Sequence, residues 1–421
     1  MKARITPSTC GGTIHIPPSK SMSHRAIICA SLANATSTIS NIAYSKDIQT
    51  TIDGMRLLGA KIETKENSVV IEGIKDFNHL SQEEIFCSES GSTLRFFIPI
   101  FSLCNKKVVF KGAGRLLQRP QKVYEDIFAQ QHLPFFQDTK SITIEQSLKA
   151  QDYTLQGDVS SQFISGLLFA LPFLKEDSRI HILPPFESKS YVDLTLQMLD
   201  TFGIHATFED ETTLFIPGNQ TYIATDYEVE GDYSQLAFFA VLGAIQNDIE
   251  ITGVSLHSQQ GDKEIIEILR SFGTHIEEID KGYRIYKSEL TAHPIDLANC
   301  PDLGPILCVL GMYSLGNTHI YHAGRLRIKE SDRILAMESE LKKFNASIHS
   351  NTDEIWIEGK TMSASNADLL GHNDHRIVMA LSIATICSTK SCTIDEAEAI
   401  NKSYPTFFDD LQKINGKVEL L

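Results

Sequence analysis

A short stretch near the N-terminus combines hydroxyl and cationic side chains in a way that is typical of an anion site. Pro18-Ser19-Lys20-Ser21-Met22-Ser23-His24-Arg25 stands directly before the apolar run 26–33. Backbone N–H groups at the start of a helix have no partners within the helix, and the helix dipole adds positive potential at the same end. With Lys20 and Arg25 beside these groups, the turn is predicted to bind an anion.

Five further polar turns stand before apolar segments in the same manner. They are Ser90-Gly91-Ser92-Thr93-Leu94-Arg95, Ser160-Ser161-Gln162, Gly231-Asp232-Tyr233-Ser234, Pro301-Asp302 and Asn373-Asp374-His375-Arg376. Consecutive turns are about 70 residues apart, a spacing that indicates an internal structural repeat. The sequence therefore predicts six copies of one unit, each with a polar turn at the start of a helix.

Other charged residues could contribute to the same chemistry. Arg115 and Arg119 follow a Gly-rich loop, and residues 325–333 hold four cations and two acids. Each feature has an ordinary structural explanation by itself: Asp302 as an N-cap, the loop arginines as surface residues, and the dense cluster as a solvated helix face. Cations at corresponding places of a repeated unit, beside two candidate acids, instead favour a site that binds ligands with several negative groups and keeps a carboxylate for proton transfer.

A metal site is not expected. His372 and His375 are close in sequence, but no third ligand has a convincing spacing.

The elements that must position these turns follow a second repeated pattern. An amphipathic helix, a Gly or Asn stop and two short strands recur, for example at 51–60 with 61–64 and 68–73, and at 333–344 with 346–349 and 355–358. Each unit then has the order strand–helix–strand–helix–strand–strand, with the first helix buried because it is apolar nearly all round. The fold class is α/β. Periodicity does not decide between one array of six units and two groups of three.

Composition excludes several classes of protein. The 421 residues carry a formal net charge of −15, which disfavours nucleic acid or an anionic membrane as the main partner. No run approaches the roughly 18 apolar residues of a membrane span, and the N-terminus has no signal-peptide core. The eight cysteines include no Cys-x-x-Cys pair, so we expect reduced core cysteines in a cytoplasmic protein.

The motifs resemble those of the 5-enolpyruvylshikimate-3-phosphate synthase (3-phosphoshikimate 1-carboxyvinyltransferase) family. The matching segments span nearly the whole chain in family order and are 19–26, 90–95, 118–120, 160–163, 188–191, 231–232, 301–302, 329–333, 373–376 and Lys402. The resemblance implies the two-domain enolpyruvyl transferase fold, an inside-out α/β barrel with three βαβαββ repeats in each domain. Residues 1–20 and 231–421 would form a discontinuous domain and 21–230 an inserted one, with the active site in the cleft between them.

The resemblance also implies a reaction and its residues. The enolpyruvyl group of phosphoenolpyruvate would pass to the 5-hydroxyl of shikimate 3-phosphate, through a tetrahedral intermediate, with release of phosphate and without a cofactor. Asp302, Glu330 and Lys20 would be catalytic. The residues expected to bind shikimate 3-phosphate are Lys20, Ser21, Arg25, Ser160, Ser161, Gln162, Ser188, Asp302 and Lys329. The residues expected to bind phosphoenolpyruvate are Lys20, Gly91, Arg119, Gln162, Arg333, Arg376 and Lys402.

Some positions depart from the family pattern. Glu89 stands where the family usually has Asn or Asp, and Arg325 stands where many members have Asn. Both departures leave the local contacts open. Because Gly91 leaves room that a side chain would fill, we expect glyphosate to compete with phosphoenolpyruvate. We expect a monomer.

Two alternatives remain to be compared. The sister enzyme that uses UDP-N-acetylglucosamine as acceptor has the same fold, but it usually carries Lys-Asn where this chain has Lys20-Ser21, and a cysteine in the loop that here spans 116–121. A ring that encircles DNA would need basic helices, whereas the helices expected here are acidic or apolar.

Overall fold

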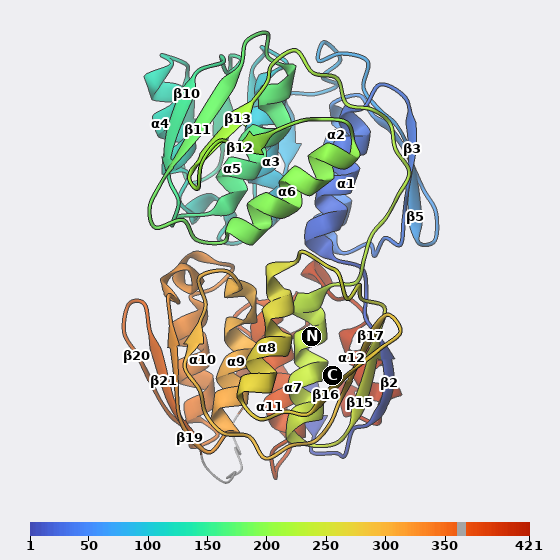
Figure 1. Cartoon of the computed structure of the whole chain (residues 1–421), viewed down its shortest axis with the longest axis vertical. Coiled ribbons are helices and arrows are strands. Elements are labelled where there is room, and N and C mark those ends of the chain that lie inside the picture. The colour runs from blue at the N-terminus through green and yellow to red at the C-terminus, as the bar shows by residue number, and fades with distance from the viewer. Residues whose placement is uncertain (360–367) are drawn as a thin grey trace. The chain divides into compact units, whose positions relative to one another are not determined.

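The chain folds into two compact units, each built from three repeats (Figure 1). The computed structural model describes residues 1–359 and 368–421. Residues 1–17 together with 230–421 form unit 1, and residues 18–229 form unit 2. The domain limits expected from the resemblance, near residues 20 and 231, are close to these unit limits.

Every repeat contains a four-stranded sheet with the same strand order. The first and second strands of the repeat are parallel to each other. Across the sheet, the strands stand in the order first, second, fourth, third, where each number is the strand's place in the repeat. The sheets of unit 2 are β14 (Tyr227–Glu228), β3 (Thr36–Ser40), β5 (Ser68–Glu72), β4 (Lys61–Thr64); β6 (Glu84–Phe86), β7 (Val108–Lys111), β9 (Ile142–Ile144), β8 (Phe135–Gln137); and β10 (Asp152–Gln156), β11 (Ser178–Leu183), β13 (Thr213–Ile216), β12 (Thr207–Phe208). Those of unit 1 are β2 (Gly12–His15), β15 (Ile249–Thr252), β17 (Gly282–Ile285), β16 (Ile276–Ile279); β18 (Ile295–Asp296), β19 (Gly316–Tyr321), β21 (Ile355–Gly359), β20 (Ser347–Ser350); and β22 (Leu369–Leu370), β23 (Cys392–Asp395), β1 (Ala3–Thr6), β24 (Lys417–Leu420).

Two kinds of helix follow one another along each repeat. The first kind lies, in chain order, between the first and second strands of each repeat and is almost wholly buried; it comprises α1 (Lys20–Leu32), α3 (Gly91–Ser102), α5 (Ser161–Ala170), α7 (Tyr233–Ile245), α9 (Gly304–Met312) and α11 (His375–Ile386). The second kind buries one face; it comprises α2 (Lys46–Leu57), α4 (Lys122–Gln130), α6 (Lys189–Thr201), α8 (Ile265–Ser271), α10 (Arg333–Lys342) and α12 (Phe407–Lys413). The predicted order strand–helix–strand–helix–strand–strand is confirmed.

Three strands complete sheets that lie far from them in sequence. β2 precedes α1 but pairs with β15, which follows α7, and β14 precedes α7 but pairs with β3, which follows α1. β1, at the N-terminus, supplies the fourth strand of the last repeat by pairing with β23 and β24. Where the chain passes from one unit to the other, the repeats of α1 and α7 therefore exchange their first strands, β2 and β14.

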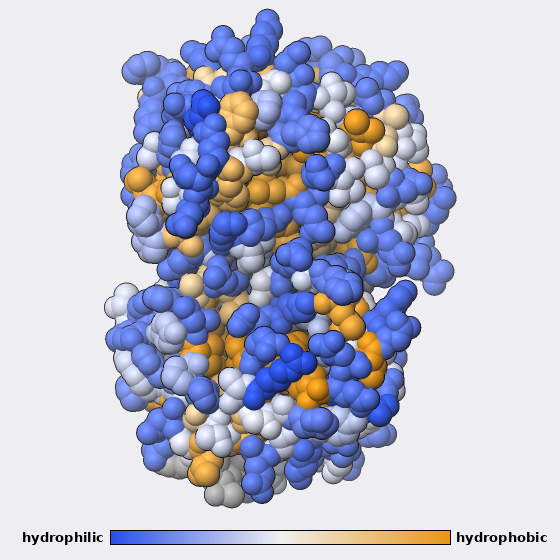
Figure 2. Space-filling model, in the orientation of Figure 1, coloured by the Kyte–Doolittle hydropathy of each residue, from blue (hydrophilic) through white to orange (hydrophobic). Residues whose placement is uncertain are grey.

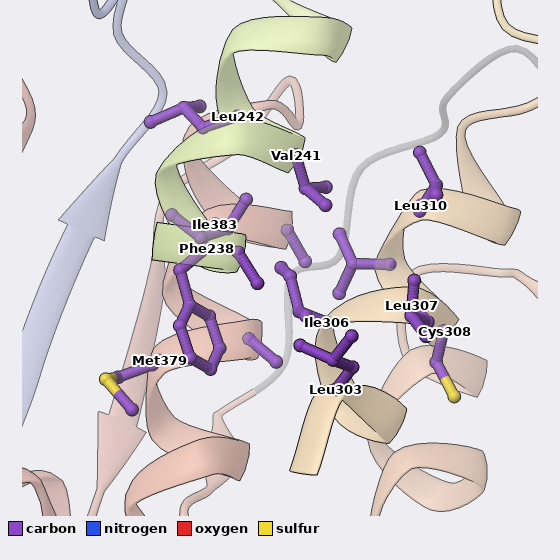
Figure 3. Close-up of a cluster of buried hydrophobic side chains, with 14 of the residues drawn as sticks. Phe238, Val241, Leu242, Leu303, Ile306, Leu307, Cys308, Leu310, Met379 and Ile383 are labelled. Carbon is purple, nitrogen blue, oxygen red and sulfur yellow. The ribbon is translucent and has the colours of Figure 1, made fainter. Parts of the chain in front are cut away.

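The buried helices form the core of each unit. In unit 1, α7, α9 and α11 pack on one another, and Figure 3 shows Phe238, Val241, Ile306, Met379 and Ile383 from these helices side by side. All five side chains are buried, and burying one such side chain stabilises the fold by about 1.5–3 kcal/mol. Hydrophilic side chains predominate on the face drawn in Figure 2.

Short 3₁₀ helices complete the backbone. They are η1 (Leu116–Gln118), η2 (Leu171–Phe173), η3 (Gly261–Glu264), η4 (Pro301–Leu303), η5 (Gly324–Ile328) and η6 (Ala397–Lys402). Seven of the eight cysteines are buried, and no disulfide joins any of them within the described part of the chain.

Candidate active site

Arg25 of unit 2 is a buried cation that is held by neutral oxygens. Its side chain is only 3% exposed. The Nε atom donates to the hydroxyl of Thr195 at 2.8 Å, and the Nη groups donate to the backbone oxygens of Ser21 and Tyr191 at 2.8 and 2.9 Å. Within the described part of the chain no carboxylate pairs with it, and burial lowers the pKa of Arg25 to about 10. A buried charge without a counter-ion is unfavourable, so this guanidinium is well suited to receive an anionic ligand.

The start of α3 lies against two other predicted site residues. Gly91 is the first residue of α3, and a Cβ placed on it would stand 2.7 Å from Nη1 of Arg119. Arg95 donates to Oε1 of Gln162 at 2.8 Å, and the Gln162 amide donates to Ser92 at 2.8 Å. These contacts bring the N-termini of α3 and α5 together with the loop before α4. The backbone of Gly91 can therefore approach a ligand closely, beside a cation.

The remaining residues predicted in unit 2 also lie at helix starts. Lys20 opens α1 and forms an ion pair with Asp47 of α2, with Nζ 2.9 Å from Oδ2. Ser160 is the N-cap of α5, and its hydroxyl accepts from the backbone of Gln162 at 3.3 Å. Ser161 and Ser188 are buried, and Ser188, at φ 53°, leads directly into α6. The predicted site residues of unit 2 are called the Arg25 cluster below: Lys20, Ser21, Arg25, Gly91, Arg119, Ser160, Ser161, Gln162 and Ser188.

Asp302 of unit 1 is surrounded by cations. Its Oδ1 atom lies 3.3 Å from Nζ of Lys329 and 3.1 Å from Nη1 of Arg333, and its Oδ2 atom lies 2.8 Å from Nη2 of Arg376. Burial raises the pKa of Asp302, but attraction by Arg376, Lys329 and Arg333 outweighs burial and holds this pKa well below its ordinary value. Asp302 is therefore ionised and paired at neutral pH.

The ordinary explanation of Asp302 as an N-cap does not apply. The residue lies inside η4, and neither η4 nor α9 has a side-chain cap. Its carboxylate is used for ion pairs instead.

Arg333 also forms ion pairs with two further acids near Asp302. Its side chain is 1% exposed, with Nη2 2.7 Å from Oε2 of Glu330 and Nε 2.9 Å from Oδ2 of Asp374. Asp374 also caps α11 by accepting from the backbone of Arg376 at 3.0 Å. Burial lowers the pKa of Lys329, although Asp302 partly offsets this effect. Asp302, Lys329, Glu330, Arg333, Asp374 and Arg376 are called the Asp302 cluster below.

Lys402 lies beside the start of α11. It donates to the backbone oxygen of Asn373 at 2.6 Å, and Arg376 donates to the hydroxyl of Ser234 at 3.0 Å. Ser234 is held in turn by Asp232, the N-cap of α7. The starts of α7 and α11 thus meet the Asp302 cluster.

Two positions that depart from the family pattern have defined surroundings. The carboxylate of Glu89 lies against Gly114, whose φ of 56° and lack of a Cβ allow that approach. Arg325 lies in η5, is buried, and its charge contributes to the lowered pKa of Lys329.

Sequence reasoning assigned no positioning role to three residues that hold predicted site residues in place. Asp47 pairs with Lys20, Asp374 pairs with Arg333, and Thr195 accepts from Arg25. Asp47 and Asp374 each stand at a helix start, which was a usable signal. Thr195 lies 170 residues from Arg25, and nothing local marks it.

Neither a metal centre nor a membrane span is found in residues 1–359 and 368–421. No group of three or more His, Cys, Asp or Glu side chains in this part of the chain could hold a metal ion. None of its helices is both long enough and apolar enough to cross a membrane.

Comparisons with known proteins agree on one family. The family model described as EPSP synthase (3-phosphoshikimate 1-carboxyvinyltransferase) matches residues 5–411. A 3-phosphoshikimate 1-carboxyvinyltransferase from Clostridium kluyveri is 42% identical over 99% of this chain and 97% of its own length, and one from Clostridium perfringens is 44% identical over 99% and 98%. An EPSP synthase structure from Acinetobacter baumannii has a TM-score of 0.81 at 25% identity, covering 99% of both chains.

A more distant structure supports the fold alone. An enolpyruvyl transferase from Streptomyces tendae has a TM-score of 0.79 at 14% identity, over 99% of this chain and 98% of its own. With a family model that matches almost the whole chain and full-length relatives above 40% identity, this chain belongs to the EPSP synthase (3-phosphoshikimate 1-carboxyvinyltransferase) family.

Proposed function

We propose that this chain transfers the enolpyruvyl group of phosphoenolpyruvate to the 5-hydroxyl of shikimate 3-phosphate and releases phosphate. The full-length relatives carry the name of this activity. The observation that carries the proposal is Arg25, a buried guanidinium without a counter-ion among the described residues. Both substrates carry a carboxylate and a phosphate, and bidentate arginines suit these groups.

The Arg25 cluster is proposed to hold most of the acceptor. Arg25 and Ser21 would bind the carboxylate of shikimate 3-phosphate. Ser160, Ser161 and Ser188 would bind its 3-phosphate, because hydroxyls at helix starts add donors to an already positive end of the helix. Gln162 would contact both ligands.

Phosphoenolpyruvate is proposed to use both clusters. Lys20, Arg119 and the backbone of Gly91 would bind its phosphate. Its carboxylate would be bound by Arg333, Arg376 and Lys402. Lys329 would reach shikimate 3-phosphate. Phosphoenolpyruvate would therefore draw on residues of both units.

Proton transfer is assigned to Asp302 and Glu330. The 5-hydroxyl oxygen would attack C2 of phosphoenolpyruvate while Asp302 takes the hydroxyl proton and Glu330 gives a proton to C3. Glu330 would then take a proton back from C3 of the tetrahedral intermediate as the bond from C2 to the phosphate oxygen breaks, and Asp302 would pass its proton to the departing phosphate. Lys20 would stabilise the negative charge of the departing phosphate. No covalent bond to the protein is required.

A proposal about the cellular setting rests on the sequence and on the family. We propose a monomeric cytoplasmic enzyme of aromatic amino acid and chorismate biosynthesis, with small-molecule substrates and with glyphosate as a competitor of phosphoenolpyruvate.

The choice of acceptor tests the proposal. Phosphate release from phosphoenolpyruvate is measured with shikimate 3-phosphate and, separately, with UDP-N-acetylglucosamine. We expect release only with shikimate 3-phosphate. Release only with UDP-N-acetylglucosamine would assign the chain to the sister activity, and release with neither acceptor would refute the proposal.

A further inference from the structure

A chain of buried hydrogen bonds in unit 2 connects three helices. It runs from His24 of α1 through Thr51 of α2 to Thr93 and the N-cap Ser90 of α3. The distances between the donor and acceptor atoms are 2.8, 2.8 and 2.7 Å. All four side chains are at most 1% exposed. These residues are called the His24 chain below.

The proton positions in the His24 chain follow from counting donors. The Ser90 hydroxyl oxygen accepts from both the backbone and the hydroxyl of Thr93. Because the Thr93 hydroxyl donates its one proton to Ser90, the Thr51 hydroxyl must be the donor in its hydrogen bond with Thr93. Thr51 has then no proton left for His24, so Nδ1 of His24 must carry a hydrogen and donate to Thr51.

The environment of His24 agrees with a neutral ring that is protonated at Nδ1. Its Nε2 atom is buried and has no hydrogen-bond partner among the described residues. A hydrogen on that atom would be an unsatisfied buried donor, which is costly. Burial lowers the pKa of His24 well below its ordinary value, and the charges of Lys20 and Arg25 lower it further.

We propose that His24 is a positioning residue that fixes the start of α3 relative to α1 through the His24 chain. Ser90 and Gly91 are adjacent, so the hydrogen bonds that hold Ser90 also hold the Gly91 backbone, against which the Arg119 guanidinium lies. This inference rests on the proposed function, in which Gly91 and Arg119 bind the phosphate of phosphoenolpyruvate. Arg25 has its own contacts outside the His24 chain. A broken chain should therefore weaken the binding of phosphoenolpyruvate and leave that of shikimate 3-phosphate nearly unchanged.

Steady-state kinetics of isosteric variants provide the first test. We expect Thr51→Val and Thr93→Val each to raise KM for phosphoenolpyruvate about tenfold, the size of one lost buried hydrogen bond, with KM for shikimate 3-phosphate within about twofold of wild type. His24→Leu should change the two KM values in the same way. His24→Asn keeps a donor for Thr51 and should restore most of the binding, as should Thr51→Ser.

The control is Ser31→Ala, which removes another buried hydroxyl from α1. Within the described part of the chain that hydroxyl has no hydrogen-bond partner, so both KM values should stay at wild-type levels. If Thr51→Val lowers Tm but leaves KM for phosphoenolpyruvate unchanged, the His24 chain is only structural and the proposal is wrong. Equal increases in the two KM values would also refute it.

The proton assignment has a test that does not need activity. Nitrogen NMR of the protein labelled with ¹⁵N-histidine should show His24 with a protonated Nδ1 and an unprotonated Nε2 across pH 6 to 8. A ring protonated at Nε2, or at both nitrogens, would overturn the inference. If the wild type does not turn over its two substrates, the proposed function fails, while the NMR result still decides the His24 chain.

Discussion

The Oδ2 atom of Asp302 lies 2.8 Å from Nη2 of Arg376, a residue 74 positions further along the chain. Lys329 and Arg333 contact the other carboxylate oxygen. In this arrangement Asp302 neutralises cations that are proposed to bind substrate, and its lowered pKa makes it a weak base. A substrate carboxylate that binds Arg333 and Arg376 would compete with Asp302 for these cations. The pKa of Asp302 would then rise, and Asp302 would become a stronger base when substrate is bound.

Replacement of Asp302 should separate chemistry from binding. We expect Asp302→Asn to lower kcat by about 100- to 10,000-fold, because a positioned general base contributes that much. Phosphoenolpyruvate should bind at least as tightly as to wild type, because Arg333 and Arg376 lose a competing carboxylate. Phosphate release and calorimetry measure the two effects, and a wild-type kcat would exclude Asp302 as the base.

Asp332→Asn is the matched control for this variant. Asp332 caps α10 and pairs with Arg327 outside the Asp302 cluster. Asparagine is also a good N-cap, so kcat should remain within about twofold of wild type.

Acid stability should report the ion pairs of Asp302. Because its pKa is lowered in the folded state, its contribution to the free energy of unfolding is complete above the unfolded-state value of about 4 and is lost as the pH falls through the folded-state pKa. The difference in unfolding free energy between wild type and Asp302→Asn should be constant from pH 5 to 8 and shrink below about pH 4. A difference that changes between pH 5 and 8 would contradict the lowered pKa. Urea unfolding across this pH range is the measurement.

A methyl group on Gly91 should act through Arg119. The Cβ of Gly91→Ala would stand 2.7 Å from Nη1 of Arg119, so the guanidinium must move. We expect KM for phosphoenolpyruvate to rise about ten- to a hundredfold because a ligand-binding group is misplaced, and glyphosate inhibition to weaken in parallel. In the double variant Gly91→Ala/Arg119→Ala, KM for phosphoenolpyruvate should rise no further than in Arg119→Ala alone. Additive losses would show that the methyl group acts elsewhere.

Removal of the buried charge at Arg25 should abolish acceptor binding without unfolding the chain. Shikimate 3-phosphate at about 100 times its Kd should stabilise wild type by about 2.7 kcal/mol. Arg25→Met should lose that stabilisation, measured as a shift of Tm. The control Arg179→Met removes an exposed arginine of the same unit, paired with Glu209, and should keep the full shift. A full shift in Arg25→Met would exclude Arg25 from the acceptor site.

Local signals were sufficient to predict the repeated elements. Ser19, Ser90 and Asp374 mark the starts of α1, α3 and α11, and each is an N-cap in the structure. The exchange of β2 and β14 between repeats, and the use of β1 in the last sheet, depend on pairing between distant segments. Periodicity carries no information about such pairing.

The composition of the two clusters could be predicted better than their contacts. Helix starts and charge indicated Arg25, Gly91 and Arg376, whereas the ion pairs of Asp302 join residues 27 to 74 positions apart. Thr195, which holds Arg25, has no local feature that distinguishes it from any other helix residue. Contacts of this kind arise only when the helices are packed.

We propose that the Arg25 cluster of unit 2 and the Asp302 cluster of unit 1 serve one reaction. The most direct test of this proposal is kcat/KM for phosphate release from phosphoenolpyruvate and shikimate 3-phosphate in wild type, Arg25→Met and Arg376→Met. We expect each single variant to lose at least about a hundredfold, since each removes a charged contact to a substrate. Wild-type kcat/KM in either variant would show that its cluster takes no part in the reaction.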